Sequence, residues 1–176
     1  MNQKGSGTLS DLRTRRTLAA IDRSMTHLIA QYDFGAINVA MICREAGITR
    51  STYYQYYLDK NDWLEREVGR LVLIATRHLP AALGQLDALV AALAPESQRV
   101  AQLLAIHDPA GDLGAALKQL FAHQFGDSDY LAGLYADIAL RTLSWRLTHA
   151  GAATPTFAAL VNVLAQQKVT DNIHHV

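Results

Sequence analysis

Apolar and polar residues alternate along the first third of the chain with the spacing of amphipathic helices. Apolar positions recur three and four residues apart at Leu18, Ile21, Met25, Leu28 and Ile29. This pattern predicts a first helix over residues 10–31, because such spacings place side chains on one helical face. The stretch Tyr32-Asp33-Phe34-Gly35 interrupts the pattern.

Three shorter helices are predicted after this break. Asn38 is a good N-cap for a helix over residues 39–45, and Thr49 can cap the next, which reaches about Tyr56. Asp59 can cap a fourth helix that begins near Lys60. Its apolar residues would face inward, namely Trp63, Leu64, Val68, Leu71 and Val72.

The rest of the chain is rich in alanine and leucine, and its prolines suggest where helices begin or join. Helices are expected near residues 80–93, 96–107, 111–125, 128–149 and 155–169. No stretch alternates apolar and polar residues between turn signals, so no sheet is predicted. The expected fold class is therefore all-α.

Charge divides the chain more sharply than its formal net charge of zero suggests. Residues 1–60 carry eight Lys/Arg against five Asp/Glu, a formal +3, and the remainder carries eight against eleven, a formal −3. A basic first part suits an anionic partner. The single cysteine, Cys43, excludes an intrachain disulfide, and no apolar run approaches the roughly 20 residues of a membrane span. We expect a cytoplasmic protein with no membrane partner.

The sequence around Gly47 has the proportions of a helix-turn-helix. Ala46-Gly47-Ile48 would join two short helices, because glycine readily adopts the left-handed conformation that ends a helix. In such a motif the second helix lies in the DNA major groove. Its first residues would then contact the bases, and these are Arg50, Ser51, Thr52 and Tyr53.

Residues 16–66 resemble the N-terminal signature of the TetR family of bacterial transcriptional regulators. The matching positions are Phe34, Val39, Ile42, Ala46-Gly47-Ile48, Thr52, Tyr54, Tyr57, Asp59-Lys60 and Leu64. The resemblance implies that Tyr54 and Lys60 contact the DNA backbone and that Tyr57 packs in the core. Asn38, Thr49 and Tyr56 complete the expected set of backbone contacts. Tyr56 occupies a position that is often histidine, and Asp33 stands where glycine is common.

The same resemblance implies a helix-turn-helix DNA-binding domain over residues 9–58 and a helical effector-binding and dimerisation domain over residues 59–172. Expected residues of the effector pocket are Leu104, His107, Phe121, Phe125, Tyr135 and Trp145. Expected residues of the dimer interface are Leu131, Leu134, Ile138, Phe157, Leu160, Val161 and Leu164. Four residues are small enough to let a partner helix approach closely, namely Ala132, Gly133, Ala136 and Ala139.

These observations predict a homodimeric regulator, expected to be a repressor, that binds a palindromic operator in double-stranded DNA and responds to an unidentified small-molecule effector. One alternative keeps the fold but acts through a protein partner or as an activator. Another is an all-α enzyme, which the sequence favours least because its histidines and acids are scattered. No Cys/His cluster supports a metal site, and we expect no cofactor.

Overall fold

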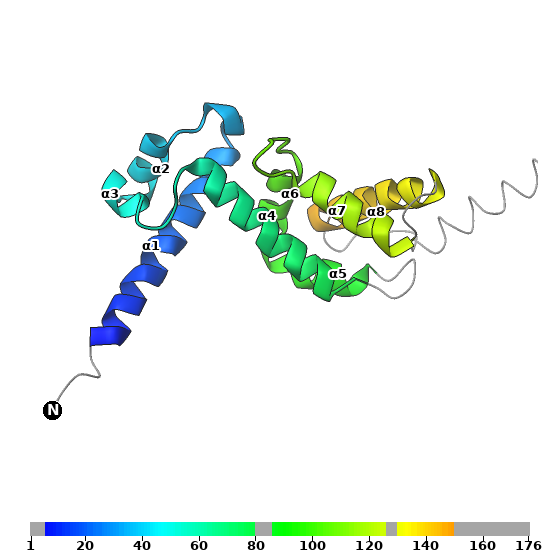
Figure 1. Cartoon of the computed structure of the whole chain (residues 1–176), viewed down its shortest axis with the longest axis horizontal. Coiled ribbons are helices and arrows are strands. Elements are labelled where there is room, and N and C mark those ends of the chain that lie inside the picture. Colours follow the sequence, from blue (N-terminus) through cyan, green and yellow to red (C-terminus); the bar gives the residue numbers. More distant parts are fainter. Residues whose placement is uncertain (1–5, 80–85, 126–129, 150–176) are drawn as a thin grey trace, which may run out of the picture. The chain divides into compact units, whose positions relative to one another are not determined.

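The computed structural model describes residues 6–79, 86–125 and 130–149. Its helices confirm the all-α prediction, and the described residues contain no strand beyond an isolated bridge between Asp108 and Gly111. The described chain forms two compact units (Figure 1). Unit 1 comprises residues up to Glu67 together with 108–111, and unit 2 comprises residues 68–107 and those from Asp112 onward.

Unit 1 contains α1 (Ser6–Ile29), the 3₁₀ turn η1 (Phe34–Ala36), α2 (Val39–Ala46), α3 (Arg50–Tyr53) and the beginning of α4 (Lys60–Arg77). Helix α1 packs against α2, and α2 packs against α3 (Figure 1). Of the predicted inner face of α1, Ile21, Met25 and Leu28 are buried, whereas Leu18 and Ile29 are half-buried. The core also includes Phe34, Ile37, Ile42, Tyr53, Trp63 and Leu64.

Helix α3 is shorter than predicted. It ends at Tyr53 rather than near Tyr56, and residues 54–56 form a turn. The backbone tightens there, because Gln55 donates to the carbonyl of Thr52 and Tyr56 donates to that of Tyr53, each three residues back. Such bonds commonly close the last turn of a helix.

Unit 2 contains the rest of α4, then α5 (Asp87–Leu93), the 3₁₀ turn η2 (Ala94–Glu96), α6 (Ser97–Leu104), α7 (Leu113–Phe125) and α8 (Tyr130–Thr148). Helix α8 packs against α5, α6 and α7. Most of these bounds lie within a few residues of the predicted ones, which is the usual uncertainty of helix ends. The predicted helix over residues 155–169 lies outside the described residues.

The small residues of α8 pack inside unit 2. Ala132, Ala136 and Ala139 are at most 4% exposed, and α8 makes its most extensive packing with α7. The expectation that these alanines receive a partner helix is therefore wrong. Their small side chains instead allow close approach between α8 and its neighbours in the same unit.

Candidate nucleic-acid interface

Side-chain caps fix the two short helices of unit 1. The side-chain carbonyl of Asn38 accepts from the backbone N–H of Met41 at 3.1 Å, which caps α2. At the other end, Gly47 ends α2 in the left-handed conformation, with φ of 65°. A side chain at this φ would be strained, so the predicted role of Gly47 is confirmed. The exposed amide group of Asn38 keeps its N–H donors for an external acceptor, because its oxygen makes the cap.

The beginning of α3 is a cluster of hydroxyl groups. The Thr49 hydroxyl accepts from the backbone N–H of Thr52 at 3.1 Å, which caps the helix. The same oxygen lies 2.8 Å from the Ser51 hydroxyl and 2.9 Å from the Thr52 hydroxyl. Thr49 and Ser51 are exposed, whereas Thr52 is half-buried. These bonds hold the side chains in one arrangement, which is useful for recognising a fixed set of acceptors.

Arg50 projects from this first turn of α3. Its side chain is exposed, and it makes no ion pair within the part of the chain that the structure describes. Burial raises the pKa of the nearby Cys43 thiol, and the positive charge of Arg50 partly offsets that effect. Cys43 is only 6% exposed, so it is a packing residue of α2, while Arg50 is available to an external partner.

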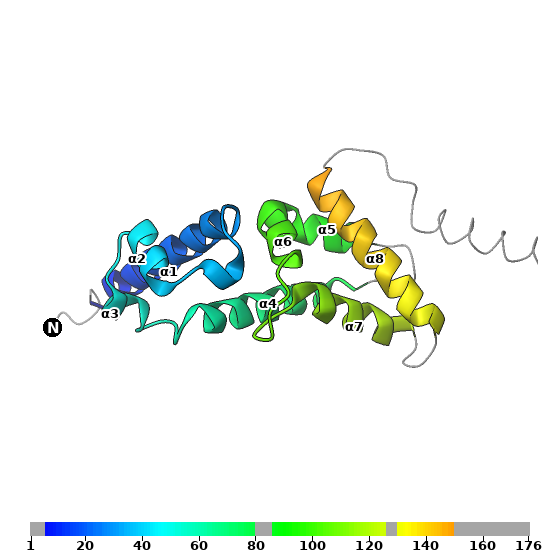
Figure 2. The same cartoon turned by 90° about the horizontal axis from the view of Figure 1, so that it is seen from above.

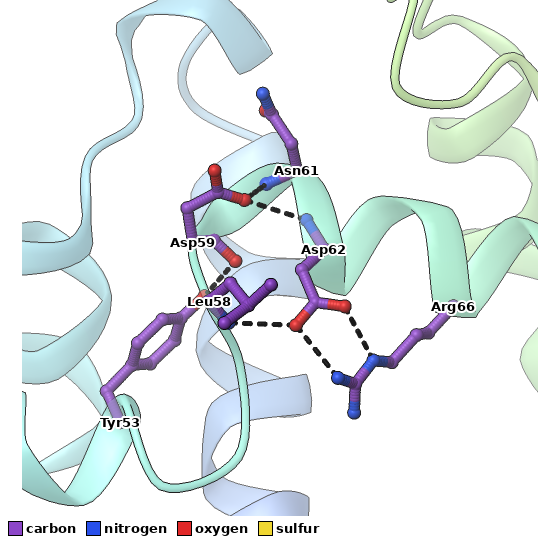
Figure 3. A network of polar contacts seen from close by, with 6 residues as sticks. All are labelled: Tyr53, Leu58, Asp59, Asn61, Asp62 and Arg66. Carbon is purple, nitrogen blue, oxygen red and sulfur yellow. Dashed lines mark hydrogen bonds and ion pairs between the residues drawn. The ribbon is translucent and has the colours of Figure 1, made fainter.

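Tyr53 cannot read bases, which corrects the prediction. Its side chain is 0% exposed, and its hydroxyl donates to the backbone carbonyl of Asp59 at 2.9 Å (Figure 3). The rings of Tyr54 and Tyr57 pack against it, with centroids 5.8 and 5.7 Å away. Burial also raises the pKa of Tyr53. Tyr53 is therefore the buried anchor that connects α3 to the loop before α4.

The neighbouring tyrosines differ in their exposure to solvent. Tyr54 is 55% exposed, consistent with an external contact, and Tyr56 is half-buried. Tyr57 is also half-buried and lies between the Tyr53 ring and the guanidinium of Arg66, whose central carbon is 5.2 Å from the Tyr57 ring centroid. The predicted core role of Tyr57 therefore holds only in part. Tyr54 is the most exposed member of the cluster that the structure places beside α3.

Lys60 has a role in the fold that the sequence did not predict. Its ammonium donates to the carbonyl of Phe34 at 2.6 Å and to that of Gly35 at 2.9 Å, and lies 4.7 Å from the centre of the Phe34 ring. These bonds fasten the beginning of α4 to η1. An ammonium has three N–H donors, so one remains for a phosphate, and the phosphate contact stays a prediction.

A polar network fixes the loop before α4, and it combines the predicted Asp59 cap with contacts of Asp62 that the sequence reading missed (Figure 3). Asp59 caps α4 by accepting from the backbone of Asn61 and Asp62, each at 2.8 Å. Asp62 accepts from the backbone N–H of Leu58 at 2.8 Å and forms a two-pronged ion pair with Arg66. The four-residue spacing of Asp62 and Arg66 on a helix is the signal that could have revealed this pair.

The residues predicted to line an effector pocket differ widely in their exposure to solvent. His107 is held at the surface, 75% exposed, by Asp112, whose carboxylate lies 2.8 Å from its ring nitrogen; His107 therefore does not line an enclosed cavity. Phe121 is buried, whereas Trp145 is 37% exposed and stacks on His149. Leu104 and Tyr135 are half-buried. The side chain of Phe125 lies outside the described set.

The predicted dimer interface is described only in part. On α8, Leu134 is 39% exposed and Ile138 is half-buried. The side chain of Leu131 lies outside the described set, and so do Phe157, Leu160, Val161 and Leu164. The dimer contacts therefore remain a prediction.

Comparison with known proteins adds no family assignment. No protein-family model matches the chain, and no curated protein matches it either. Among the described helices, none combines the length and apolar character that crossing a membrane requires. Within the same residues, no group of three or more His, Cys, Asp and Glu side chains has the arrangement of a metal site.

Proposed function

We propose that the chain is a DNA-binding transcriptional regulator of the TetR type, and that unit 1 inserts α3 into the major groove. The observation that carries this proposal is the first turn of α3. Arg50 and Ser51 are exposed there, Tyr54 follows on the surface, and buried Tyr53 holds the turn in place. Exposed groups on a rigid, short helix are what base recognition requires.

In this proposal Arg50 and Ser51 contact bases, with Thr52 at the edge of the contact. Arginine can donate two bonds to a guanine edge, and hydroxyl groups can contact either bases or phosphates. Asn38, Thr49, Tyr54, Tyr56 and Lys60 would hold phosphates. Unit 2 would dimerise, because one short helix reads too few base pairs and paired heads read two half-sites about 34–36 Å apart.

The remaining features of the proposal follow from the resemblance. The regulator is a cytoplasmic homodimeric repressor of a palindromic operator, and a small-molecule effector that binds unit 2 releases it from DNA. The effector needs only to prefer the DNA-free arrangement of the dimer by a few kcal/mol.

The test is selection of bound duplexes from a random DNA pool by the full-length protein. An enriched palindrome, with affinity that falls steeply as salt rises, supports the proposal. No enrichment from a folded, dimeric protein contradicts it and favours action through a protein partner. In the selected site, Arg50→Ala should change the preferred bases and cost about 1–3 kcal/mol.

Tyr54→Phe provides the contrasting variant. It removes only the exposed hydroxyl, so it should weaken binding to all sequences by a similar factor and leave the preferred sequence unchanged. If Arg50→Ala also left the preferred sequence unchanged, Arg50 would not be a base-reading residue. The two variants therefore separate base contacts from phosphate contacts in the same assay.

A further inference from the structure

Helix α1 carries its charges on separate faces. At 3.6 residues per turn, Arg13, Arg16 and Arg23 lie within about 80° of one another around the helix. Asp11 and Asp22 lie on roughly the opposite side. One face of α1 therefore carries three positive charges and no acid among its described residues; we call it the basic face.

The acidic side of α1 already has partners. Asp22 accepts from the indole N–H of Trp63 at 2.9 Å, which ties α1 to α4 within unit 1. Asp11 pairs with Arg15 at 3.0 Å. Arg13, Arg16 and Arg23, by contrast, are exposed and make no ion pair within the residues that the structure describes.

The basic face does not contribute to the core of unit 1. From Asp11 to Ala20 no residue of α1 is buried, and among the side chains described from Asp11 onward the first buried one is Ile21. Maintaining three like charges on one helical face costs repulsion rather than adding stability. An anionic partner would compensate that repulsion.

The basic face borders the element that leads into α3. A hollow of about 350 Å³ lies on this face, lined by Ala20, Arg23, Ser24, His27, Glu45 and Ala46. Glu45 and Ala46 end α2 and directly precede the Gly47 turn from which α3 begins. Glu45 pairs with His27 at 2.7 Å, so the one acid lining the hollow already has a partner.

The first turns of α1 extend toward the same end of unit 1 as α3. In Figure 1 and in Figure 2, α3 and the beginning of α1 both lie at the left-hand end of unit 1. The ten residue steps from Arg13 to Arg23 span about 15 Å along the helix axis. A DNA strand places a phosphate roughly every 3.4 Å along its axis, so this length faces several phosphates.

We propose that the basic face of α1 is a second DNA-contacting surface, which binds backbone phosphates flanking the bases read by α3. This inference rests on the proposed function and adds to it a set of sequence-independent contacts outside the core operator. Phosphate contacts of this kind contribute affinity and salt dependence without changing base preference.

The experiment compares full-length variants on the duplex selected in the random-pool experiment. One duplex keeps long flanks beyond the palindrome, and the other ends at its last base pair. Arg13→Gln/Arg16→Gln removes two charges of the basic face, and Gln keeps a good helix propensity. The single variant Arg16→Gln is measured as well. Arg15→Gln is its matched control, because Arg15 is adjacent in sequence but lies on another face and pairs with Asp11.

The proposal predicts that each lost contact weakens binding to the long duplex on the order of tenfold near 0.1 M salt. The double variant should also lower the salt slope by about two, while the selected sequence stays the same. On the short duplex the double variant and the wild type should bind equally. Arg15→Gln should match the wild type on both.

Two results would overturn this inference while leaving the proposed function intact. One is equal binding of the double variant and the wild type to the long duplex. The other is the same weakening by Arg15→Gln as by Arg16→Gln, which would indicate a nonspecific charge effect. Failure of the wild type to bind any selected duplex would instead contradict the proposed function itself. Circular dichroism and thermal unfolding of each variant ensure that only folded proteins are compared.

Discussion

The two units are held together in different ways. In unit 1 specific side-chain bonds hold the connections around α2, α3 and α4: Asn38, Thr49 and Asp59 cap helices, Lys60 binds the carbonyls of η1, and Tyr53 binds the loop before α4. In unit 2, α5, η2 and α6 begin without any side-chain cap, whereas Asp112 caps α7 by accepting from the backbone N–H of Ala115 at 2.7 Å. There the helices are held mainly by aliphatic burial, as at Leu89, Leu103, Leu117, Ala136 and Leu143.

This difference explains what each unit can be expected to do. A directional hydrogen bond requires one residue type at one position, so unit 1 holds its exposed groups in a defined geometry. Aliphatic burial is non-directional and accepts many combinations of side chains of similar volume. Unit 2 can therefore accept many hydrophobic replacements while keeping its helices.

The largest expected effect comes from removing the anchor of unit 1. Tyr53→Ala should destabilise unit 1 by about 3–5 kcal/mol, because it removes a buried ring and leaves a cavity. It should also abolish DNA binding, since the first turn of α3 loses its support. Urea unfolding followed by circular dichroism gives the loss of stability, and binding to the selected duplex gives the functional loss.

Two milder variants test whether the two units are held together in different ways. Tyr53→Phe keeps the ring but loses the bond to Asp59, and should cost about 1 kcal/mol. Phe121→Leu in unit 2 keeps an apolar side chain but leaves part of a buried site empty, so it should cost about 1–3 kcal/mol. If Phe121→Leu were as damaging as Tyr53→Ala, the two units would not differ in the way described.

The second effect concerns close packing in unit 2. Ala136→Leu should destabilise the protein by about 1–3 kcal/mol, because its site is fully buried and cannot accept a larger side chain without shifts. Ala115→Leu on the exposed surface of α7 should change stability by less than about 0.5 kcal/mol. Thermal unfolding of both variants is the measurement, and equal values would contradict close packing around Ala136.

The alanines of α8 also show what the sequence alone could not predict. Their spacing correctly indicates a closely packed helical face, but not whether the neighbour is α7 of the same chain or a helix of another. Small residues permit close approach to any partner, so composition cannot distinguish the two. The helices themselves were predictable, because their apolar periodicity is local.

In unit 1 the predictions succeeded where the determining bond is local. The caps at Asn38 and Thr49 and the left-handed Gly47 connect residues at most four apart. Tyr53 and Lys60 were harder, because their partners are more distant in sequence: Asp59 lies 6 residues after Tyr53, and Phe34 lies 26 residues before Lys60. A tyrosine beside three exposed polar residues looks like another surface residue until the path of the following loop is known.

The third effect tests a cap beside the proposed base contacts. Thr49→Ala should cost about 1 kcal/mol, because the backbone N–H of Thr52 loses its acceptor at the beginning of α3. Thr49→Ser retains the hydroxyl and should stay close to the wild type. Chemical unfolding measures the cap, and affinity for the selected duplex shows whether fraying of α3 also weakens binding. Equal stability of the alanine and serine variants would mean that the cap contributes nothing.

The smallest expected effect is a loss of stability in acid, and one carboxylate of each unit serves to test it. In unit 1 the backbone N–H of Leu58 lowers the pKa of Asp62, with help from Arg66. In unit 2 the guanidinium of Arg70 lowers the pKa of Glu96, which it binds in a two-pronged pair. A folded-state pKa below the unfolded value stabilises the protein above the ordinary carboxyl pKa of about 4. That contribution is lost as the pH falls through the lowered value.

Asp62→Asn and Glu96→Gln should therefore each flatten the decline in stability between about pH 5 and pH 3. At pH 7 each variant should cost less than about 1 kcal/mol, because both carboxylates are partly open to water. Urea midpoints at several pH values provide the comparison. Asp62→Asn should also lower DNA affinity, because Asp62 fixes the loop that buried Tyr53 binds, whereas Glu96→Gln should leave DNA affinity unchanged. If both variants lost DNA affinity equally, the geometry of unit 1 would not be what determines DNA affinity.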